Sequence, residues 1–96
     1  LGEELENGVA NRMADGVALK ELFANAPDTA PGAEQRAAFS ASEPDALTLS
    51  AVTAWLDQGF ALLIELHAWA EESDDALDRR IWAFLVEHTE RHKFDL

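Results

Sequence analysis

The sequence predicts an all-α fold: a small helical bundle of three long helices and one short helix, with the last two helices forming an antiparallel hairpin. Three long stretches carry apolar residues at helical spacing, and proline-containing or acidic segments separate them. The turn before the last stretch is so short that its two helices must lie side by side and run in opposite directions. We expect residues 1–96 to form a single helical domain, either a whole protein or a fragment of a longer chain.

The first long helix is predicted over residues 3–25. Leu5, Val9 and Met13 recur every fourth residue and form one apolar stripe. The stripe then continues with a shifted phase, and the shift falls at Asp15-Gly16. Asp15 could cap a second short helix at this point, or the glycine could be tolerated inside one helix at a cost of about 1 kcal/mol. We expect a continuous or gently kinked helix. The residues of the shifted stripe are Val17, Leu19, Leu22 and Phe23.

The middle of the chain is predicted to hold a loop and one short helix. Pro27 ends the first helix, because the residue before a proline avoids the α region. Residues 33–41 can form two helical turns with Phe39 as their only large apolar anchor. The next helix then begins between residues 44 and 50. Its candidate caps are Ser42 or Asp45, which would place Pro44 in the first turn, and the competing Thr48 and Ser50.

The main helix is predicted around residues 50–72 and is the centre of the fold. Leu62, Ile64 and Trp69 lie off its apolar stripe, so more than one neighbour must cover it. Gly59 permits another backbone to approach closely at its middle. The stripe itself has the i, i+3, i+4, i+7 spacing of an amphipathic helix and consists of Val52, Trp55, Leu56, Gly59, Phe60, Leu63, Leu66, His67 and Ala70.

The last helix is predicted over about residues 74–92. Ser73 or Asp74 caps it, and the neighbouring aspartates favour its N-terminus. Trp82 and Val86 lie beside the apolar stripe of this helix. The stripe is made of Leu77, Ile81, Phe84, Leu85, His88 and His92.

The composition of the chain is strongly acidic, since 19 Asp and Glu against 7 Lys and Arg give a net charge of −12. Direct binding to nucleic acid or to an anionic membrane surface is therefore not expected, because both need a basic face. The absence of cysteine excludes disulfides and thiolate sites, and it fits the cytoplasmic location that we expect. We also expect no membrane span, because the most apolar run contains Asp57, Glu65 and His67.

Two histidines are the main candidates for a metal site. His88 and His92 lie four residues apart on one helix, which places their imidazoles on one face about 6 Å apart. His67 would lie roughly 13 Å further along the hairpin, too far to complete the site. We favour the interpretation that these are histidines stabilised at a helix C-terminus. The sequence thus predicts no cofactor and no metal centre, with His88 and His92 as weak candidates for a surface cation.

The surplus of large apolar residues predicts a protein-interaction module, such as an accessory protein, an adaptor or an inhibitor. Leu62, Trp69, Trp82 and Val86 point away from the primary stripes. Either the short helix and the first helix cover them, or they form the candidate interface, where tryptophan is enriched. We expect a homodimer built on the hairpin, with a second copy, another protein or both as the partner. A metal- or ligand-binding bundle and an acidic DNA mimic are the alternatives. An enzyme is not expected, because no catalytic motif is present.

Overall fold

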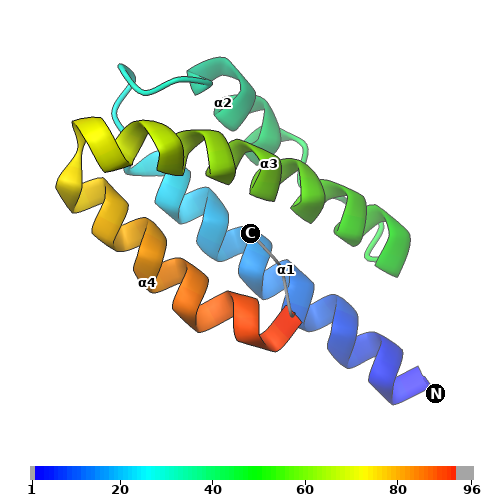
Figure 1. The fold of residues 1–96 in the computed structure, drawn as a ribbon. Helices are drawn as coiled ribbons and strands as arrows, with labels where there is room; N and C mark the ends of the chain where they lie inside the picture. The colour runs from blue at the N-terminus through cyan, green and yellow to red at the C-terminus, as the bar shows by residue number, and fades with distance from the viewer. Residues whose placement is uncertain (1, 93–96) are drawn as a thin grey trace.

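The computed structural model describes the backbone of residues 2–92 and the side chains of residues 8–88. It confirms an all-α fold, with no strand in the part of the chain that it describes. Three long helices and one short helix pack against one another (Figure 1). In chain order they are α1 (Gly2–Ala24), α2 (Ala33–Ala41), α3 (Leu49–Ser73) and α4 (Asp75–His92).

The helix α3 lies at the centre of the bundle and contacts each of the other three helices. Figure 1 shows α2 on one side of α3, and α1 and α4 on the other. The helices α1 and α3 run in the same direction, and α4 returns antiparallel to both. Only Asp74 separates α3 from α4, and its Oδ1 accepts a hydrogen bond from the N–H of Leu77 at 3.1 Å. The predicted hairpin and the predicted cap at Asp74 are therefore confirmed.

Thr48 sets the start of α3. Its side-chain oxygen accepts a hydrogen bond from the N–H of Ala51 at 3.2 Å, which satisfies one of the free donors at the helix N-terminus. The alternative start near Pro44 is wrong, because residues 43–48 are not helical. Ser42 instead closes α2, donating its backbone N–H to the carbonyls of Ala38 and Phe39 at 3.0 and 3.2 Å.

The core of the bundle is centred on two aromatic side chains from α2 and α3. The rings of Phe39 and Trp55 are stacked, with centroids 4.7 Å apart and planes 7° apart. The indole Nε1–H of Trp55 also donates a hydrogen bond to the carbonyl oxygen of Phe39 at 2.8 Å. The ring of Phe23 from α1 packs edge-on against Phe39, with ring centroids 5.5 Å apart. Three helices therefore meet at Phe39, which is the buried anchor of α2 that the sequence predicts.

The predicted apolar stripe of α3 is confirmed, with His67 half-buried at its edge. The helix α1 is continuous through Asp15-Gly16, as we expected, but its shifted stripe is partly wrong. Val17 is exposed, whereas Asp15 and Gly16 are buried. The reason is close packing of a side chain on the glycine backbone: a Cβ atom on Gly16 would lie 2.2 Å from Cζ3 of the Trp55 indole. A Cβ atom on Gly59 would similarly lie 2.5 Å from Cδ2 of Leu19.

Arg36 on α2 is a buried cation, and loss of its charge is expected to be well tolerated if the packing of its aliphatic stem is kept. Its Nη2 donates to the carbonyl of Pro27 at 3.2 Å, but Nε and Nη1 are buried without a hydrogen-bond partner among the described residues. Burial of a partly satisfied guanidinium is costly, whereas its aliphatic stem contributes packing. We expect Arg36→Met to change the free energy of unfolding by less than about 1 kcal/mol, or to raise it, and Arg36→Ala to lower it by about 1–2 kcal/mol. Urea denaturation of both variants measures this, and equal losses would contradict it.

One helix of the described residues, α3, is long and apolar enough to cross a membrane, with a mean hydropathy of 1.3. The expectation that Asp57, Glu65 and His67 would make this run fail such a test is therefore not supported by length and composition. The finding is weak evidence for a span, because the core helix of a soluble protein passes the same test. In this fold, 39% of the most apolar 18-residue segment of α3 is buried inside the protein.

Candidate functional site: an apolar groove on the α3–α4 hairpin

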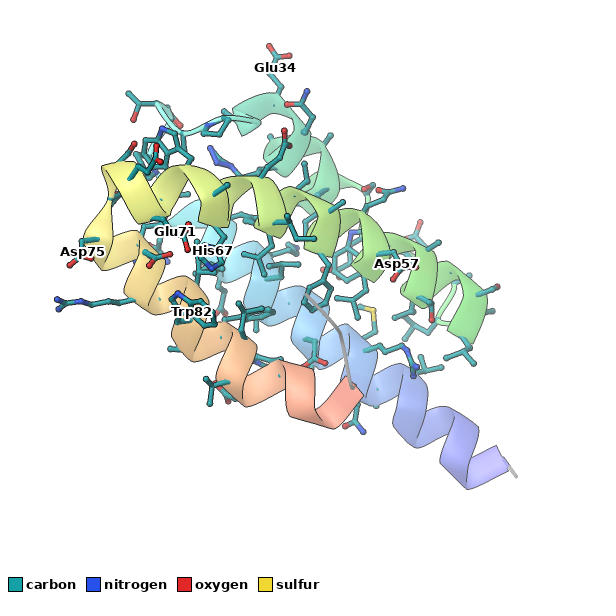
Figure 2. The ribbon with its side chains drawn as sticks, viewed as in Figure 1. Glu34, Asp57, His67, Glu71, Asp75 and Trp82 are labelled. Atoms are coloured by element: carbon teal, nitrogen blue, oxygen red, sulfur yellow. The ribbon has the colours of Figure 1, made fainter. Side chains whose placement is uncertain are left out.

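The outer face of the α3–α4 hairpin carries large apolar side chains in contact with solvent. Ile64 on α3 is 53% exposed, and Trp82 and Val86 on α4 are 51% and 72% exposed. A groove of about 420 Å³ lies beside them, between the two helices. Figure 2 shows Trp82 and His67 on this face, with Glu71 next to them. The groove is lined by Leu63, Ile64, His67, Ala68, Glu71, Trp82 and Leu85.

His67 lies in the middle of the α3 side of the groove and joins the two helices. Its Nδ1 lies 3.3 Å from Oδ1 of Asp78 on α4 and 3.7 Å from Oε1 of Glu71 on α3. The imidazole also meets Trp82 edge to face, with ring centroids 5.0 Å apart. These contacts hold Trp82 in position although half of its surface is exposed, and a fixed aromatic ring is the usual anchor of a protein interface.

Acidic side chains flank this apolar groove on its α3 side, where Glu71 lines it. Asp57, Glu65 and Glu72 are exposed and recur every seven or eight residues, so they follow one ridge along α3. On α4, Asp75 is exposed and its Oδ2 lies 3.1 Å from Nη2 of Arg79, so this arginine is already paired. Figure 2 shows Asp57, Glu71 and Asp75 spread along the hairpin on the viewed face. The groove therefore combines an apolar floor with an acidic rim.

The four predicted interface residues do not gather at one surface. Trp82 and Val86 lie on the exposed face of α4. Leu62 and Trp69 are partly buried and pack against the core. Leu62 lines a different groove, of about 430 Å³, between α2 and α3. Ile64 is the residue that the predicted interface omits, and its place off the apolar stripe of α3 was the available signal.

Of the two candidate metal ligands, His88 is committed to another contact. It is buried, and its Nδ1 contacts Oδ1 of the fully buried Asp15 on α1. His88 Nε2 lies 3.8 Å from Oε2 of Glu87. The side chain of His92 lies outside the described residues. Within residues 8–88, no group of three or more His, Cys, Asp or Glu side chains is placed to hold a metal ion.

The contact between Asp15 and His88 is the feature that the sequence analysis missed. It links α1 to α4 in the interior, where an isolated carboxylate would be strongly destabilising. The signal for it was Asp15 itself, a polar residue at the place where the apolar phase of α1 shifts. Both side chains are buried, so the pair is suited to positioning two helices rather than to meeting a substrate.

Comparisons with known proteins give no relative from which a function could be transferred. The sequence was compared with protein-family models and with curated proteins, and the fold was compared with solved structures. None of the three comparisons finds a match to this chain. What the protein does must therefore be inferred from the side chains described above.

Proposed function

We propose that this chain is a small protein-interaction module, of the accessory, adaptor or inhibitor type, and that it binds through the outer face of the α3–α4 hairpin. The observation that carries the proposal is Trp82, which is half exposed beside an apolar groove and held there by His67. Exposed apolar surface gains about 25 cal/mol per Å² when a partner covers it. Tryptophan at the edge of a pocket is typical of the residues that dominate binding energy.

The arrangement of the exposed apolar residues favours this face over the rest of the described surface. Val17, Leu47 and Leu49 are also exposed, but they belong to α1, to the loop before α3 and to the first turn of α3. Single exposed apolar residues are normal in soluble proteins and need no partner. Ile64 and Trp82 instead lie on both sides of one groove, which makes the hairpin a candidate surface for binding.

A second copy of the chain is one partner that this face could take, and the homodimer expected from the sequence would place the two Trp82 side chains near a shared axis. Electrostatic repulsion opposes such a homodimer, because each copy brings a net charge of −12 and the same acidic rim. Another protein with a complementary charge meets no such repulsion.

Photocrosslinking tests the proposal directly. A photoreactive benzoylphenylalanine is placed at position 82 of the full chain, in the cells that produce the protein naturally. The matched control carries the same group at position 47, because Leu47 is 60% exposed but lies in the loop before α3. We expect discrete crosslinked products from position 82 and few from position 47. No product from position 82, or the same products from both positions, would contradict the proposed function.

A further inference from the structure

Resting on the proposed function of the α3–α4 face, we propose that the segment it binds is a cationic amphipathic helix of another protein. The groove would receive the apolar stripe of that helix, and the acidic rim would receive its lysine or arginine side chains. Three properties of the described residues carry this inference: the shape of the groove, the sign of the charge around it, and the pairing of the nearby cations.

The shape of the groove favours a helix. It lies between two antiparallel helices, and a third helix packs into such a groove through its side-chain ridges. The α3 side of the groove extends from Leu63 to Glu71, which corresponds to about 12 Å or two helical turns. A peptide that binds by strand pairing would need an exposed strand edge, and residues 2–92 contain no strand.

The charge around the groove favours a basic partner. Glu71 lines the groove and its side chain is 56% exposed. Glu65 and Glu72 on the outer ridge of α3 are exposed as well. A cation on a partner helix in the groove would pair with Glu71 at the partly desolvated edge of the interface, and Glu65 and Glu72 would add to the attraction.

The two arginines of α4 whose side chains the structure describes, Arg79 and Arg80, do not neutralise this rim. Arg79 is paired with Asp75, so the two charges cancel. Arg80 points toward α1, where its Nη2 donates to the carbonyl oxygen of Asn25 at 3.5 Å. A second copy of the chain would bring its own acids to the same rim, and like charges across an interface are strongly unfavourable. The charge pattern therefore selects a basic helix over self-association.

Binding of model peptides tests the inference. The probe is a labelled amphipathic peptide with leucines on one helical face and lysines on the other, measured by fluorescence anisotropy with the full chain. A peptide of the same composition in scrambled order removes the apolar stripe, and a peptide with glutamate in place of lysine reverses the charge. We expect the lysine helix to bind at least tenfold more tightly than either control, and its affinity to fall as salt concentration rises.

Matched variants place the binding on the groove. Glu71→Lys is expected to weaken the lysine helix about tenfold, and Glu34→Lys, which makes the same change of charge on α2, to weaken it less than threefold. Ile64→Ser on the groove is also expected to weaken binding of the lysine helix, and Leu47→Ser in the loop before α3 is its matched control. All four positions are exposed, so circular dichroism should show unchanged folds.

The outcomes separate this inference from the proposed function. Equal weakening by Glu71→Lys and Glu34→Lys, or equal binding of the three peptides, overturns the basic helix. If position 82 still crosslinks to another protein, the interaction module stands while its helical, cationic partner does not. A position-82 product that consists of two copies of this chain overturns the basic helix in favour of a homodimer.

Discussion

Asp15→Ala is expected to lower the free energy of unfolding by about 3 kcal/mol, the largest loss that we predict for a single polar side chain of this protein. Asp15 is fully buried on α1, and its Oδ1 contacts Nδ1 of His88 on α4. Removing the carboxylate leaves the buried imidazole without that partner and opens a small cavity between the two helices. Urea denaturation followed by circular dichroism measures the loss.

A double-mutant cycle separates the pairing from the burial of each side chain. We expect His88→Ala alone to cost a similar amount, and the double variant to cost at least 1 kcal/mol less than the sum of the two single losses. Asp57→Ala is the control, because Asp57 is exposed on α3 and its loss should change stability by less than about 0.5 kcal/mol. Strictly additive losses at positions 15 and 88 would show that the two side chains do not act as a pair.

Gly16→Ala is expected to lower the free energy of unfolding by about 2–3 kcal/mol, although alanine favours a helix over glycine by about 1 kcal/mol. The new methyl group would overlap the indole of Trp55, whose Cζ3 and Cη2 lie 2.2 and 2.7 Å from the Cβ position. The indole cannot easily withdraw, because it is stacked on Phe39 and its N–H is bonded to the carbonyl of that residue. The helices α1 and α3 must then separate.

Gly8→Ala gives the matched control on the same helix. A Cβ atom on Gly8 would meet only Nη1 of Arg12, at 3.3 Å, and a flexible arginine can move aside. We therefore expect this variant to gain up to about 1 kcal/mol from helix propensity alone. Thermal melting of Gly16→Ala and Gly8→Ala compares their stabilities. If Gly16→Ala is as stable as Gly8→Ala, the close contact between α1 and α3 is not as tight as described.

Local patterns in the sequence were sufficient to predict most of the fold. The buried stripe of α3 follows from apolar periodicity, because a helix that buries one face must repeat its apolar residues every three or four positions. Asp74 was identified as a cap because capping depends on a side chain and backbone groups only three residues apart.

The features that were missed depend on contacts between distant parts of the chain. Asp15 looks like a helix cap until His88, 73 residues later, is known to lie beside it. Val17 continues an apolar pattern, but the close approach of Trp55 to Gly16 rotates that side of α1 outward. For the candidate site, the sequence left two alternatives open for the residues off the stripe, cover by another helix or an interface. Leu62 and Trp69 pack against the core, whereas Trp82 and Val86 are exposed. Periodicity shows that a residue leaves one stripe, but it does not show what covers it.

The one-residue connection between α3 and α4 also bears on how the chain folds. Contacts near that turn join residues close in sequence, so their loop-closure entropy is small and the hairpin is expected to form early. Docking of α1 closes a much longer loop and comes later. The Asp15–His88 contact should thus form after the rate-limiting step, and its removal should speed unfolding far more than it slows folding. In stopped-flow experiments on Asp15→Ala, the unfolding arm of the chevron plot would move to higher rates, and the folding arm would remain nearly in place.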